Sequence, residues 1–68
     1  MLYNVSWFYK LPDNGLKYLG NQTVSADSPA DALAFTALPP GERTQFVLDH
    51  PDIETWEGAD IIYRADLL

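Results

Sequence analysis

The chain has 68 residues, with ten Asp and Glu side chains, four Lys and Arg side chains and no cysteine. A chain of this length forms a single domain, residues 1–68, around a small core, and without cysteine it has neither disulfide bonds nor a cysteine-based zinc site to strengthen that core. Two means of stabilisation remain: a core rich in aromatic side chains, which the 13% aromatic content supports, and association with a partner subunit.

The charges are unevenly distributed along the chain. Residues 1–24 hold two lysines and one aspartate, a net of +1, whereas residues 25–68 hold nine acids and two arginines, a net of −7. Direct binding to nucleic-acid phosphates is disfavoured because it needs clustered Lys and Arg. Attraction to a basic surface of another protein is favoured, although an acidic surface also simply keeps a protein soluble.

No targeting or membrane segment is recognisable. Met1 leads directly into a strand-like stretch, with no basic segment before it. No apolar run approaches the ~20 residues that a membrane-spanning helix needs. We therefore expect a cytoplasmic protein that does not bind a membrane.

Residues 2–11 form the clearest strand in the sequence. Aromatic and β-branched side chains alternate with polar ones, which predicts a pleated strand with one buried face. That face carries Tyr3, Val5, Trp7, Tyr9 and Leu11. Residues 12–15, Pro-Asp-Asn-Gly, are a turn signal, so residues 16–24 are the second arm of a β-hairpin. Gly20 within that arm indicates a bulge or a close approach by another backbone, and the alternative is a second turn at residues 20–21 that shortens the strand.

A helix is predicted to begin at Ser28. Ser28 is a suitable N-cap, Pro29 fits the first helical position, and Asp31 favours the positive helix end. One face of the helix carries Ala30, Leu33, Ala34, Ala37 and Leu38. The helix must stop at residues 39–41, Pro-Pro-Gly.

In the last third of the chain, the pattern of apolar residues predicts mainly strands. Residues 42–50 are read as a strand, with a short helix as the rival, because so short an apolar run does not separate the two. Residues 53–57 and 61–65 are predicted strands joined by a tight connection at residues 58–60, and residues 66–68 are expected to fray. The predicted fold is α+β: a small antiparallel sheet of about four strands in the order ββαββ, with one helix packed on one face.

Catalytic and metal-binding patterns are poorly represented. There is no Cys nucleophile, and His50 is the sole histidine. Ser6, Ser25 and Ser28 are the serines considered as its partner in a Ser–His–acid arrangement, but no nucleophile elbow or Gly-rich oxyanion loop accompanies them. The densest set of potential metal ligands is Asp49, His50, Asp52 and Glu54. Its spacing matches no EF-hand loop, and a solvated acidic turn explains it better. We predict no enzymatic activity, cofactor or metal; a weak enzyme or metal binder centred on His50 is the third hypothesis.

Aromatic and acidic side chains together predict a protein-binding surface. One helix covers only one face of a sheet, so Phe8, Trp56 and Tyr63 are expected on the opposite, exposed face, where aromatic residues favour protein contacts. The predicted binding residues are Glu42, Asp49, Asp52, Glu54, Trp56, Glu57 and Asp60.

The sequence thus favours a small acidic, non-enzymatic module that docks on a basic surface of another protein. In its sharper form the partner is a nucleic-acid-binding protein, and the module is an inhibitor that mimics nucleic acid. The alternative is a structural or accessory subunit that acts mainly as a homodimer or larger homo-oligomer, with exposed strand edges as one route of contact.

Overall fold

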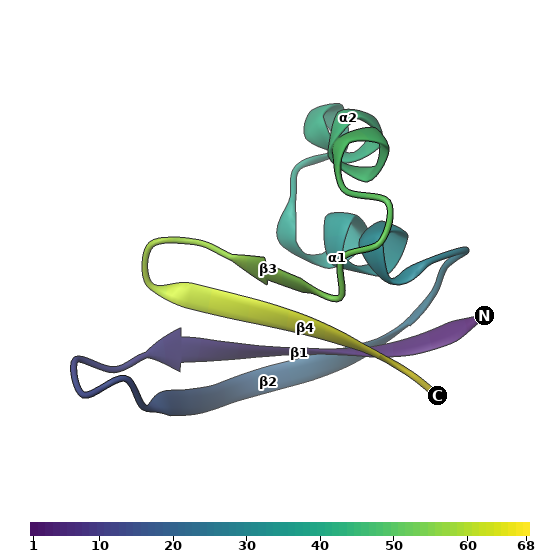
Figure 1. Cartoon of the computed structure of the whole chain (residues 1–68). Helices are drawn as coiled ribbons and strands as arrows, with labels where there is room; N and C mark the ends of the chain where they lie inside the picture. The colour runs from purple at the N-terminus through teal and green to yellow at the C-terminus, as the bar shows by residue number, and fades with distance from the viewer.

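Four antiparallel strands form one sheet, and two helices stack over one end of one of its faces (Figure 1). This computed structural model describes residues 1–68. The elements are β1 (Leu2–Lys10), β2 (Leu16–Ser25), α1 (Pro29–Ala37), α2 (Pro40–Asp49), β3 (Thr55–Glu57) and β4 (Ile61–Leu67). Their order across the sheet is β2-β1-β4-β3, which confirms the α+β fold and its four-stranded antiparallel sheet. Neither helix has the length and apolar character needed to span a bilayer.

The predicted hairpin is present as β1 and β2. Asn14 takes a positive φ of 67° in the turn, and the Gly15 N–H donates to Asp13 Oδ1 at 2.9 Å. Trp7 pairs with Gly20 and Phe8 pairs with Tyr18, so the extra residue of a bulge lies between Gly20 and Tyr18 in β2. A Cβ on Gly20 would lie 3.1 Å from Cζ2 of Trp7, so the close approach is made by an indole ring and not by a backbone.

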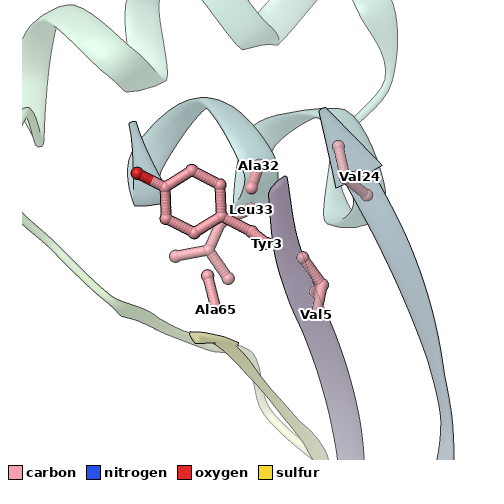
Figure 2. Close-up of a cluster of buried hydrophobic side chains, with 6 residues drawn as sticks. All are labelled: Tyr3, Val5, Val24, Ala32, Leu33 and Ala65. Carbon is pink, nitrogen blue, oxygen red and sulfur yellow. The ribbon is translucent and has the colours of Figure 1, made fainter. Parts of the chain in front are cut away.

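The core lies where α1 crosses the sheet. Tyr3 and Val5 of β1 are buried, as the alternation predicts, and Leu33 of α1 is fully buried against them. Figure 2 shows side chains from α1, β1, β2 and β4 converging at this point. The cluster consists of Tyr3, Val5, Val24, Ala32, Leu33 and Ala65. Small alanine side chains allow the helix to lie close to the sheet, so few residues suffice to build the core.

The start of α1 follows the prediction. Ser28 Oγ accepts a hydrogen bond from the Asp31 N–H at 3.1 Å, and the Ser28 hydroxyl donates to Asp31 Oδ2 at 3.0 Å. Pro29 occupies the first turn. The helix ends at Ala37, because Leu38 precedes a proline and is extended.

The prediction of a strand over residues 42–50 is wrong, because these residues belong almost entirely to α2. Pro40 both limits α1 and starts α2, as proline suits a first helical position. The Arg43 Nε and Nη2 groups donate to the carbonyls of Leu38 (3.1 Å) and Phe35 (3.2 Å), which anchors α2 to the end of α1. The order is therefore ββααββ, with a second helix stacked on the first.

Two further boundaries differ from the prediction. The strand expected over residues 53–57 is limited to Thr55–Glu57, with Ile53 packed against the core outside it. The tail expected to fray is ordered, because Leu67 pairs with Tyr3 and the Leu68 N–H donates to the Leu2 carbonyl at 2.9 Å.

The expected faces of several aromatic side chains also need correction. Trp56 pairs with Tyr63, and Tyr63 pairs with Trp7, so all three rings lie on the helix side in a row across β3, β4 and β1. The ring centroid of Tyr63 is 5.9 Å from that of Trp56 and 5.7 Å from that of Trp7. Phe8 lies on the opposite, open face, as expected, where it contacts Tyr18 edge-on at 5.8 Å.

The far end of the first strand extends beyond the helices. Tyr9 and Leu11, predicted on the buried face, are 44% and 37% exposed. Figure 1 gives the reason: the helices cover the end of the sheet at which both chain ends lie, and the β1–β2 turn projects at the other end.

Candidate protein-binding surface

The acidic part of the sequence forms the two helices and the β3 edge of the sheet (Figure 1). Residues 27–60 hold eight acids and one arginine, a net of −7. Residues 1–26 and 61–68 hold two acids and three cationic side chains, a net of +1. The charge asymmetry of the sequence therefore becomes an asymmetry in space, with β2 at the edge of the sheet opposite to β3.

The negative charge of residues 27–60 is hardly neutralised within the molecule. The single cation, Arg43, donates to backbone carbonyls and lies 4.9 Å above the Phe35 ring, and it forms no ion pair. Of the eight acids, Glu57 alone forms an ion pair, with Lys10 at 2.9 Å. Seven carboxylates therefore have no cationic partner. Six of them are exposed, and the seventh, Asp31, is half-buried beside Ser28. Their field attracts positive charge.

Three of the predicted binding residues lie together. Glu42, Asp49 and Trp56 line a hollow of about 440 Å³ between α2 and the β3 edge. The same hollow is lined by Leu38, Gly41, Gln45, Phe46 and His50. Asp49 accepts a hydrogen bond from Gln45 at 2.8 Å, so its carboxylate is held at the end of α2. Carboxylates beside aromatic rings suit a Lys or Arg side chain.

The other predicted binding residues are not part of this hollow. Asp52 and Glu54 are exposed in the connection from α2 to β3, and Asp60 is exposed in the turn before β4. Glu57 pairs with Ile62, which pairs in turn with Phe8, so Glu57 lies on the open face of the sheet. There its carboxylate forms the ion pair with Lys10. Glu57 is thus separated from the hollow although it follows Trp56 in the sequence.

A second groove, which sequence reasoning missed, lies between α1, α2 and the start of the chain. It has a volume of about 500 Å³. Its apolar lining includes Phe35 and Leu48, which are 52% and 69% exposed, and Asp27 and Asp31 stand at its margin. None of the residues of α2 is buried, so this helix presents much of its apolar surface to solvent. Phe35 lies beside the predicted buried stripe of the helix, and this position was the sequence signal that could have indicated the groove.

The residues considered for catalysis and metal binding are dispersed or already engaged. No three His, Asp or Glu side chains converge in a way that would hold a metal ion. Ser28 serves as the N-cap of α1, and His50 is exposed with its ring centroid 5.1 Å from that of Phe46. What this surface offers chemically is negative charge next to exposed apolar side chains.

Comparison with protein families, with characterised proteins and with solved structures finds no match to this chain. The function is therefore inferred from the charges, the exposed apolar side chains and the two depressions described above.

Proposed function

We propose that this protein is a small non-enzymatic binding module whose acidic helical side docks on a basic surface of another protein in the cytoplasm. The observation that supports this proposal most directly is the set of seven carboxylates within residues 27–60 that have no cationic partner in the molecule. Charges that are not neutralised internally steer a cationic partner and accelerate encounter.

The apolar groove between α1 and α2 would add contact energy that charge alone does not supply. Exposed ion pairs contribute only about 0–1 kcal/mol each, whereas burying a Leu or Phe side chain contributes about 1.5–3 kcal/mol. Phe35 and Leu48 are the side chains available for this purpose, and Asp27 and Asp31 lie beside them. The partner surface would therefore combine Lys or Arg side chains with an apolar anchor.

In the sharper form of the proposal the basic partner is a nucleic-acid-binding protein and the module inhibits it. The carboxylates would then occupy the positions of phosphates and compete with nucleic acid for the same cationic side chains. Competition between this protein and an oligonucleotide for the captured partner distinguishes this form from docking elsewhere on the partner.

The test compares two double variants, each of which changes the net charge from −6 to about −4 by replacing two acids with neutral amides. Glu42→Gln with Asp49→Asn neutralises the hollow beside α2. The control, Asp13→Asn with Asp66→Asn, neutralises acids outside residues 27–60. Each tagged protein is used to capture partners from host extract at low and high salt, and the recovered partner is quantified.

We expect capture to fall at high salt and to fall with the first pair of substitutions but much less with the control pair. A yield that does not depend on salt would contradict the proposal. Equal losses with both pairs would show that total charge matters and that the acidic helical side does not.

A further inference from the structure

The outer edge of β2 presents backbone groups that no part of the molecule satisfies. Met1 and Ala26 exchange two backbone hydrogen bonds, from the Ala26 N–H to the Met1 carbonyl at 2.9 Å and from the Met1 amino group to the Ala26 carbonyl at 3.1 Å. Bonded pairs alternate along an antiparallel ladder, so Val24 and Gln22 also bond to β1. The residues between them direct their N–H and C=O groups away from β1: Asn21, Thr23 and Ser25.

This part of the edge carries none of the usual protection against strand pairing. Such protection consists of proline, inward or edge charges, bulges or a covering element. In β2 the bulge and Lys17 lie before Gly20, and no proline occurs. Asn21, Thr23 and Ser25 are exposed. The opposite edge of the sheet, β3, has only three residues.

The charge distribution selects a second copy of this chain as the occupant of that edge. Contact between two copies through their helices or β3 edges would bring a net of −7 against another −7. Contact through β2 brings together strands that contain one lysine and no acid, and the acidic sides then point in opposite directions. An antiparallel pairing about a two-fold axis uses the same edge on both copies and closes the dimer.

We propose that two copies associate by antiparallel pairing of their β2 edges over residues 21–25, which joins the two sheets into one. The side chains of Asn21, Thr23 and Ser25 are small, polar and uncharged, so they tolerate a cross-strand neighbour of the same kind. The dimer presents two acidic helical sides, and a bivalent partner would bind it more tightly than the monomer.

The test uses Thr23→Pro, with Thr23→Val as the matched control. Proline removes an N–H that points away from β1, and an edge strand tolerates it when that N–H faces solvent. Valine keeps the N–H and the strand propensity. Sedimentation velocity over a wide concentration range measures the mass of each protein.

The wild type and Thr23→Val are expected to rise from 7.6 kDa towards twice that mass, and Thr23→Pro is expected to remain at the monomer mass. Added salt should strengthen the dimer, since it screens repulsion between two chains of net charge −6. Added salt should instead weaken docking on a basic partner. The opposite salt dependences therefore show which of the two proposals has failed. A wild type that stays monomeric, or a Thr23→Pro variant that dimerises equally, would overturn the inference.

Amide hydrogen exchange of the wild type provides a second measurement that does not require the proline variant to fold. With increasing protein concentration, the Asn21, Thr23 and Ser25 amides should become protected, while the Gln22 amide, already bonded within the sheet, should change little. Exchange of the first three amides that is independent of concentration would also overturn the inference.

Discussion

At the scale of single residues, stability depends on a few fully buried side chains. Leu33 and Val5 are the largest side chains with no exposed surface, and Leu33 is the one bulky residue among the alanines that α1 places on the sheet. Many other large apolar side chains are exposed, so they contribute little to folding. The contribution of a leucine to the stability of this protein therefore depends on its position in the fold.

Leu33→Ala should lower the free energy of unfolding by about 2–5 kcal/mol, because it removes buried methyl groups and leaves a cavity. The control is Leu48→Ala, which alters a side chain that is 69% exposed and should change stability by less than about 0.5 kcal/mol. Urea unfolding followed by Trp fluorescence measures both. Comparable losses in the two variants would contradict the position of the core.

At the scale of elements, α2 is held differently from the others because it lies on α1 and neither belongs to the sheet nor packs along it. None of its residues is buried. The link is made by Arg43, whose guanidinium donates to the carbonyls of Phe35 in α1 and of Leu38 just after it, and by Phe46, which packs against the core. An element attached in this way opens more readily than the sheet.

Arg43→Met should loosen α2 selectively, because it keeps the apolar stem and removes both hydrogen bonds. We expect a loss of about 1 kcal/mol, which is a roughly fivefold increase in amide exchange within α2, and little change in β1. Lys17→Met, at an exposed position of β2, is the control. Exchange that rises equally in all elements would indicate global unfolding and contradict this attachment.

At the scale of the whole molecule, the fold separates an acidic helical side from a weakly cationic sheet edge. The helices and β3 carry most of the carboxylates and line most of both depressions, while the β2 edge carries free backbone groups. On our two proposals, one side would meet a basic partner and the other a second copy. The two contacts would share only Ser25, which lines the groove between α1 and α2 and also ends the β2 edge.

Leu48→Ala, the stability control above, also tests the groove between α1 and α2. It should leave folding intact and weaken capture of the basic partner by roughly tenfold, the effect of about 1.4 kcal/mol of lost apolar contact. The loss should persist at high salt, because apolar contact is not screened. Unchanged capture would restrict the binding surface to the hollow beside α2.

Local sequence signals by themselves determined the hairpin turn, the Ser28 cap, the buried face of the first strand near Tyr3 and Val5, and the excess of acid in the later part of the chain. Each of these depends on neighbouring residues or on simple counting. Tertiary contacts decided the rest. Residues 42–49 lie in a helix that Arg43 anchors to the end of α1, a contact that the local pattern does not reveal. Trp56 faces the helices because its strand pairs with β4.

The candidate site shows the same division. The sequence identified carboxylates, but only the fold shows that Glu42, Asp49 and Trp56 line one hollow while Glu57 pairs with Lys10 on the other face. The groove at Phe35 and Leu48 exists only once two helices stack. Residues far apart in the chain are brought together by packing that no local pattern encodes, and a binding surface is made of such residues.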